Sequence, residues 1–236
     1  GFVQWQCLSL RKILDMGTIR MTVKAIDWTG GDVGHVSVAL RGGSCRIDWG
    51  DGRTSSIRSR TNDESMIYAD HVYPRGCMKS SDIFEIIIIS DNDNLIGFYS
   101  GCIDMEILKL DLKGCPELEK LILSGSVRGV TFRNNPNLKE LDITGDAGVD
   151  MNFSNNKNLE ILKLHSCDIR KLDISKCDKL WYLDCGYSKL QEIAVSNNSA
   201  LTELIFWDEC HLSQKSQYFI NRTLERNDGK LTIEGI

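Results

Sequence analysis

The chain has 236 residues, of which 42% are hydrophobic and 26% charged, and its net charge at pH 7 is −5. These values are ordinary for a globular protein of one large or two smaller domains, and they exclude a disordered tail, a collagen and a low-complexity polymer. No apolar run approaches the ~18 residues of a membrane-spanning helix. The acidic excess argues against nucleic acid as a partner, because a phosphate backbone attracts basic surfaces.

Residues 1–17 are compatible with a short helix or an extended lead segment. Strand-like segments follow, and they are separated by turn signals rich in Gly, Asp and Pro. The expected strands cover residues 18–26, 35–40, 45–49, 68–73 and 84–90. Several short strands at this spacing predict a small β-sandwich over residues 18–102.

A turn motif inside this region gives a family resemblance. Segment 47–52 reads Ile-Asp-Trp-Gly-Asp-Gly, and His-Val-Tyr follows at 71–73. Together they resemble the PKD-type immunoglobulin-like module, in which the Trp-Gly-Asp-Gly turn joins two strands and the later His-x-Tyr packs near it. The resemblance implies that Asp48 and Asp51 brace the turn through backbone hydrogen bonds, with a calcium site at these carboxylates as the alternative. It also implies a cell-surface or periplasmic location, because such modules commonly precede repeats or sugar-active domains in exported proteins; no signal or anchor is visible in this chain.

Segment 91–95, Asp-Asn-Asp-Asn-Leu, has the acidic start of a calcium-binding EF-hand loop. It lacks the glycine at position six and the glutamate at position twelve of such a loop. We therefore expect a turn that leads from the sandwich into the second half of the chain.

An apolar phrase, Leu-x-x-Leu followed by x and a third apolar residue, recurs from about residue 103 onward. Its first leucines are Leu118, Leu138, Leu159, Leu180 and Leu201, at spacings of 20, 21, 21 and 21 residues. A second phrase is interleaved at the same spacings, with the apolar pairs Leu110/Leu112, Val130/Phe132, Met151/Phe153, Leu172/Ile174 and Ile193/Val195. Two short alternating segments per period predict two short strands per coil, and the coils must stack to bury their apolar sides.

A polar or thiol residue follows each apolar pair of the second phrase by three positions. These residues are Cys115, Asn135, Asn156, Cys177 and Asn198. We expect the asparagines to satisfy buried backbone groups at the turn of each coil, and the cysteines to fill the same slot as small thiols. Cys115 and Cys177 would lie three coils or ~14 Å apart, which is too far for a disulfide bond.

The repeated phrase is similar to the leucine-rich repeat. The run Leu159-x-x-Leu162-x-Leu164-x-x-Cys167-x-Ile169 fits that pattern throughout, and residues 172–190 resemble the 21-residue variety of Bacteroidetes surface proteins and internalin-like proteins. The resemblance implies a solenoid of about five coils over residues 103–212 that serves as a binding scaffold. The ninth position departs from the pattern in most coils, so either phrase could form the concave sheet; we favour the first.

The repeat ends before a predicted cap at residues 213–236. Ser213 is a suitable N-cap for a helix, and Ile220 and Leu224 lie on one face of it at i, i+4 spacing. The Asn-Asp-Gly at 227–229 ends the helix, and residues 231–233 are predicted to form a last short strand. We expect this segment to cover the apolar end of the solenoid, which would otherwise be exposed to solvent.

The nine cysteines are Cys7, Cys45, Cys77, Cys102, Cys115, Cys167, Cys177, Cys185 and Cys210. No Cys-x-x-Cys pair occurs, so the usual zinc and thioredoxin spacings are absent. The strongest metal hypothesis combines His165 and Cys167 with Cys177 or Cys185. We favour the alternative that the thiols are buried hydrophobic residues, and we expect neither a metal site nor a cofactor.

Catalysis is not indicated by any motif. The phosphate-binding glycine loop, Gly-x-Ser-x-Gly and His-Glu-x-x-His are missing, although scattered carboxylates leave glycoside hydrolysis open. Alternation along the first phrase instead places one set of residues on the outer face of the sheet. The candidate binding residues on that face are Ile122, Asp142, Lys163, His165, Tyr182, Asp184, Ile205 and Trp207.

We single out Tyr182 and Trp207, because binding energy concentrates at exposed aromatic side chains. The expected function is a monomeric, non-catalytic interaction module for a protein or a glycan. A spacer without a ligand and a polysaccharide-active enzyme are the alternatives.

Overall fold

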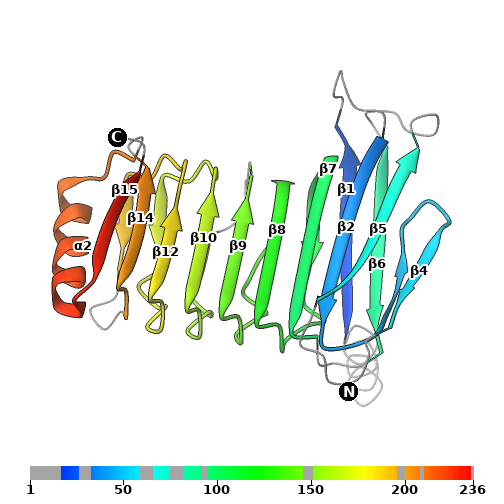
Figure 1. Ribbon diagram of the computed structural model, residues 1–236, viewed down its shortest axis with the longest axis horizontal. Helices are drawn as coiled ribbons and strands as arrows, with labels where there is room; N and C mark the ends of the chain where they lie inside the picture. The colour runs from blue at the N-terminus through cyan, green and yellow to red at the C-terminus, as the bar shows by residue number, and fades with distance from the viewer. Residues whose placement is uncertain are drawn as a thin grey trace, which may run out of the picture.

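The computed structural model describes residues 17–26, 33–58, 66–74, 82–91, 95–145, 151–195, 200–207 and 210–234. The described chain is mainly β and contains a β-solenoid of about five turns. Its principal sheet has 13 strands. The strands from β15 to β4 follow one another along the long axis of the molecule, and β2 and β5 branch off this path through β7 (Figure 1). No helix in these residues is long and apolar enough to cross a membrane.

The N-terminal strands agree closely with the segments expected from the sequence, and β4 is a further strand that was not expected. They are β1 (Thr18–Ala25), β2 (Val33–Arg41), β3 (Cys45–Asp48), β4 (Thr54–Ile57), β5 (Ile67–Pro74) and β6 (Ile83–Ser90). β1 and β6 alternate buried and partly exposed residues, as a half-buried strand requires. Strands β1, β6, β3 and β4 pair in that order, and β2 pairs with β5.

A long strand, β7 (Gly97–Asp111), joins these N-terminal strands to the solenoid. Its first half pairs antiparallel with β2 and its second half antiparallel with β1. Its other edge pairs parallel with the first solenoid strand, and the register of that pairing shifts between Gly101 and Glu106. Asp104, inside the shift, has a left-handed backbone with φ 56°. The expected boundary between residues 102 and 103 therefore falls within one continuous strand.

The first repeated phrase forms the larger sheet of the solenoid. Its parallel strands are β8 (Lys120–Val127), β9 (Glu140–Thr144), β10 (Ile161–His165), β12 (Tyr182–Cys185), β14 (Glu203–Trp207) and β15 (Lys230–Glu234). The second phrase forms a narrower sheet, in which β11 (Lys171–Asp173) pairs parallel with β13 (Glu192–Ala194). Isolated β-bridges extend this narrower sheet toward the N-terminus. They pair Leu110 with Val130 and Asn152 with Asp173.

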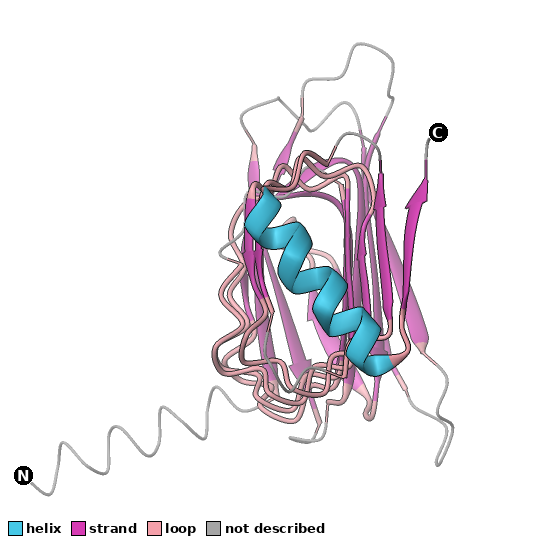
Figure 2. Cartoon of the chain, turned by 90° about the vertical axis from the view of Figure 1, so that its left-hand side faces the viewer, coloured by secondary structure: helices cyan, strands magenta, loops and turns pink. Residues whose placement is uncertain are grey.

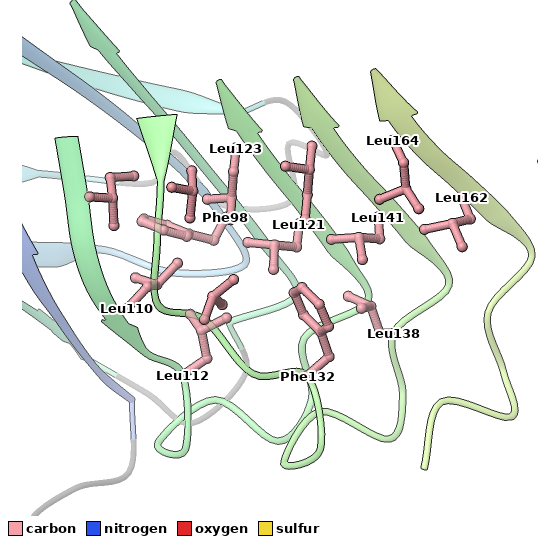
Figure 3. Close-up of a cluster of buried hydrophobic side chains, with 14 of the residues drawn as sticks. Phe98, Leu110, Leu112, Leu121, Leu123, Phe132, Leu138, Leu141, Leu162 and Leu164 are labelled. Atoms are coloured by element: carbon pink, nitrogen blue, oxygen red, sulfur yellow. The ribbon is translucent and has the colours of Figure 1, made fainter. Parts of the chain in front are cut away.

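Equivalent leucines of successive coils stack on one another inside the solenoid. Leu121, Leu141 and Leu162 occupy paired positions on β8, β9 and β10, and none of them has accessible surface. Figure 3 shows them side by side, with Phe132 of the opposite layer beneath. Burying one such side chain contributes ~1.5–3 kcal/mol, and this contribution recurs in every coil. The periodic sequence thus produces one continuous core that no coil could form alone.

Two successive coil turns share one pattern of side-chain hydrogen bonds. Asn135 donates through Nδ2 to the carbonyls of Leu112 (3.1 Å) and Cys115 (2.8 Å). Asn156 does the same one coil later, to Phe132 (3.0 Å) and Asn135 (2.9 Å). The Oδ1 atoms of both asparagines are buried and have no partner among the described residues.

Cys115 and Cys177 occupy the corresponding positions of their own turns, and each donates its backbone N–H to the residue three positions before it. Burial raises the pKa of both thiols to about 12. Asn198, the fifth residue of this series, lies outside the described residues.

The C-terminal helix begins and ends where the sequence predicts. In α2 (Gln214–Asn227) the Ser213 side chain accepts from the N–H of Ser216, and Asp228 ends the helix with a left-handed backbone. The Oγ atom of Ser216 accepts in turn from the N–H of Ile193, which attaches the helix to β13. Figure 2 shows α2 lying across the end of the solenoid, with β15 beside it at the edge of the larger sheet.

Candidate functional site

The outer face of the larger solenoid sheet carries three rows of side chains, and the strand register defines them. The middle row is Ile122, Asp142, Lys163, Asp184 and Ile205. One flanking row is Lys120, Glu140, Ile161, Tyr182 and Glu203, and the other begins with Ser124, Thr144 and His165 and continues to Trp207. Adjacent members of a row lie ~4.8 Å apart, the spacing of neighbouring strands.

Asp184 connects three groups on this face. Its Oδ2 atom accepts from His165 Nε2 at 2.9 Å and from the Tyr182 hydroxyl at 3.4 Å. Its Oδ1 atom accepts from the N–H of Gly186 at 2.9 Å. The residue is only 7% exposed, and these bonds compensate for burying its charge. Because a carboxylate can only accept, the Asp184 bond places the proton of His165 on Nε2.

Trp207 packs over the end of β12. Gly186 lies beside it, directly after the end of β12, and an added Cβ there would lie 2.8 Å from the indole Nε1 atom. A side chain at residue 186 would therefore displace the indole, and glycine permits the close approach. The ring of Tyr187 stacks on the indole, with centroids 3.7 Å apart and planes inclined by 26°.

Alternation along the strands did not identify Tyr187, because this residue lies just beyond the end of β12. Its backbone is left-handed, with φ 56°. Positive φ recurs at this position of successive coils, at Asp104, Gly125, Gly145, Ser166 and Tyr187. At Gly145 an added Cβ would lie 2.4 Å from the Gly125 carbonyl oxygen, so glycine is required there. In the sequence, Gly125 and Gly145, spaced by 20 residues, indicate this series of left-handed positions.

Lys163 and two aromatic residues complete the cluster. The Lys163 ammonium lies 5.8 Å from the centre of the Tyr182 ring, within the range of a cation–π contact. Trp181 meets Tyr182 edge-on, with ring centroids 5.6 Å apart. The structure therefore brings together Lys163, His165, Tyr182, Asp184 and Trp207, with Ile205 beside Asp184. Asp142 lies one strand away on β9, and Ile122 lies a further strand away on β8.

The proposed metal ligands do not converge. His165 is on the outer face beside Asp184, whereas the buried Cys167 thiol lies within reach of the Ile143 carbonyl oxygen (3.7 Å). Burial of Cys185 raises the pKa of its thiol well above the ordinary value. The described ranges contain no group of three or more His, Cys, Asp or Glu side chains that could hold a metal ion.

A second side-chain cluster surrounds the Trp-Gly-Asp-Gly turn. Asp48 accepts from the N–H of Gly50, and Asp51 accepts from the N–H of Arg53, both at 3.0 Å. The predicted bracing of the turn is confirmed. His71 lies 2.9 Å from Asp51 Oδ2 and stacks on Trp49 at 4.8 Å.

Tyr73 adds to this cluster by donating its hydroxyl to the carbonyl of Trp49 at 2.7 Å. Its ring also packs on Phe84 of β6, with centroids 4.3 Å apart. The carboxylates of the turn are thus engaged by protein groups, and the cluster connects β3, β5 and β6.

Comparison of the chain with protein-family models, curated proteins and solved structures gave no match.

Proposed function

We propose that the protein is a non-catalytic recognition module that binds a protein or a glycan through the outer face of its larger solenoid sheet. The observation that carries this proposal is the stacked pair Tyr187 and Trp207 beside the Asp184–His165 pair. Aromatic rings with adjacent hydrogen-bonding groups are the usual centres of binding energy.

The rigidity of the cluster supports recognition. Tyr182, Asp184 and Trp207 stand on strands whose neighbours pair in register on both sides. Hydrogen bonds fix Asp184, and stacking fixes Trp207. Binding groups held in this way lose little conformational entropy when a ligand arrives.

The family assignments belong to the same proposal. The 21-residue period and the stacked Leu-x-x-Leu strands support a leucine-rich-repeat solenoid. The contacts of Trp49 with His71 and Tyr73 support a PKD-like β-sandwich before it. Such a pairing favours a location outside the cytoplasm, at the cell surface or in the periplasm.

A binding screen against glycans and proteins tests the proposal. We expect a ligand that binds the native protein and loses affinity in the Trp207→Ala and Tyr182→Ala variants. Tyr218→Ala is the matched control, because Tyr218 is exposed on α2, away from this face. A ligand bound equally well by all three variants would contradict the proposal.

A spacer role is the second candidate. The 13-stranded sheet runs without interruption from β4 to β15, and buried residues of both halves form one core. This continuity suits a stiff rod that holds other parts of a protein apart. The absence of any ligand in the screen would favour it.

A further inference from the structure

We infer that the ligand of this face is a neutral, linear glycan, and that Tyr187 is the ring on which a sugar unit stacks. This inference rests on the proposed function and narrows it to one ligand class.

Tyr187 presents an open, fixed aromatic ring. The residue is 53% exposed, although Trp207 covers its ring at 3.7 Å. The Trp207 indole supports the Tyr187 ring from one side, and the close approach of the indole to Gly186 holds the indole in place. A pyranose ring exposes a face of C–H groups, and such a face packs well on a flat aromatic ring with a polar tip. Tyrosine has few rotatable bonds, so fixing it costs little entropy.

A row of uncharged hydrogen-bonding groups leads to this ring. Ser124, Thr144 and His165 lie at paired positions of β8, β9 and β10. The row crosses the strands over roughly 10 Å at the usual strand spacing. Hydroxyl groups can donate and accept, as sugar hydroxyls do. A linear chain of sugar units laid across the strands would meet these groups in succession.

Several charges on the same face have a partner of opposite sign. Lys120 pairs with Glu140 at 2.7 Å, and the Asp184 carboxylate accepts a hydrogen bond from His165 at 2.9 Å. Lys163 has Asp142 opposite it on one neighbouring strand and Asp184 on the other. The middle row and the Tyr182 row together carry four carboxylates and only two ammonium groups, so the face has a negative excess; the carboxylates are Glu140, Asp142, Asp184 and Glu203. This excess repels an acidic polymer, whereas a neutral chain meets no repulsion, so among glycans the face favours an uncharged one over an acidic one.

The position of the ring at the end of the row favours a glycan over a protein partner. Aromatic anchors of protein interfaces usually fill desolvated pockets at the centre of the contact. Tyr187 instead stands open at the end of a hydroxyl-lined row. A single sugar unit can cover it without the large surrounding contact area that a protein interface needs.

Titration calorimetry of the full chain with neutral hexasaccharides tests the inference. The probes are β-1,4-linked glucose, xylose and mannose and β-1,3-linked glucose. We expect at least one to bind, and Tyr187→Ala to weaken that binding by about tenfold or more. Tyr187→Phe keeps the stacking ring and is expected to retain affinity within about twofold. Tyr218→Ala should bind as the native protein does.

A second variant separates lost contact from lost structure. Tyr187→Gly removes the ring at a position whose φ of 56° suits glycine, so the backbone remains unstrained. It should weaken binding as Tyr187→Ala does while keeping the native circular dichroism spectrum.

Two results would overturn the inference: none of the four sugars binds, or one binds and Tyr187→Ala leaves its affinity unchanged. If the screen then finds a protein whose binding is lost in Trp207→Ala, the proposed function stands and the glycan assignment fails. If the screen finds no ligand of any class, both fail.

Discussion

Asn156 donates its side-chain amide to the backbone carbonyl of Asn135 at 2.9 Å, so the turn of one coil is bonded to the turn before it. Asn135 makes the equivalent bond to Cys115 at 2.8 Å. The main-chain bends of three consecutive coils are thereby linked inside the solenoid, where water cannot replace the bonds.

Replacing Asn156 with alanine should therefore lower the free energy of unfolding by ~1–3 kcal/mol, because two buried hydrogen bonds are lost and the Phe132 and Asn135 carbonyls each keep only one backbone donor. Denaturant unfolding followed by circular dichroism measures the change. Asn155→Ala is the control, since Asn155 is exposed and makes one bond, to the Arg133 carbonyl. A neutral effect of Asn156→Ala would show that these bonds do not stabilise the solenoid.

The stacked leucines give a second prediction. Leu162 has no accessible surface and lies between Leu141 and Leu183. Leu162→Ala should destabilise the protein by ~2–5 kcal/mol, through lost burial and the cavity left behind. Ile161→Ala, one residue earlier and pointing outward, should cost clearly less. Equal losses for the two variants would contradict the inward and outward assignment of β10.

The turn cluster predicts a pH dependence of stability. Burial acts to raise the pKa of Asp51, but the hydrogen bonds from the Arg53 N–H and His71, with the positive charge of both residues, lower that pKa overall. Because the folded-state pKa lies below the unfolded value of about 3.9, the stabilisation is present above that pH and is lost as the pH falls through the folded value.

Asp51→Asn should thus reduce stability by ~1–3 kcal/mol at pH 7, with a smaller deficit below about pH 4. Urea midpoints measured from pH 7 to pH 3 provide the test. Asp168→Asn serves as the comparison, since its ion pair with Lys189 is exposed. A loss of stability in Asp51→Asn that stays constant from pH 7 to pH 3 would contradict the lowered pKa of Asp51 in the folded protein.

The period of the leucines was sufficient to predict the solenoid strands, because inward alternation and stacking follow directly from it. Leu121, Leu141 and Leu162 lie in the core as the repeated phrase predicts. The helix cap at Ser213 was equally readable, since its side chain satisfies a free N–H.

Strand β4 was not predicted, and β7 was predicted only at its end, where Leu110 belongs to the second repeated phrase. Thr54–Ile57 is polar at three of its four positions, so it lacks the apolar alternation of a strand. Gly97–Asp111 contains two glycines and a register shift, and it pairs with different partners along its length. These pairings depend on contacts that are distant in sequence, which local patterns do not encode.

The candidate site was predictable only where alternation applies. Tyr182, Asp184 and Trp207 stand on strands, and their common face follows from the period. Tyr187 stands after a strand, and its direction depends on a left-handed backbone. The hydrogen bond between Asp184 and His165 depends on side-chain geometry across two coils.

The accessibility of the thiols is the most direct measurement of the stacked solenoid on which the outer face depends. Cys115, Cys167, Cys177 and Cys185 are buried, and burial raises the pKa of Cys115 and Cys177 to about 12. Treating the native protein at pH 8 with a water-soluble thiol reagent, followed by peptide mass mapping, should leave these four unmodified. All four should react once guanidinium chloride unfolds the chain. Rapid modification of most of them in the native protein would contradict the stacked core.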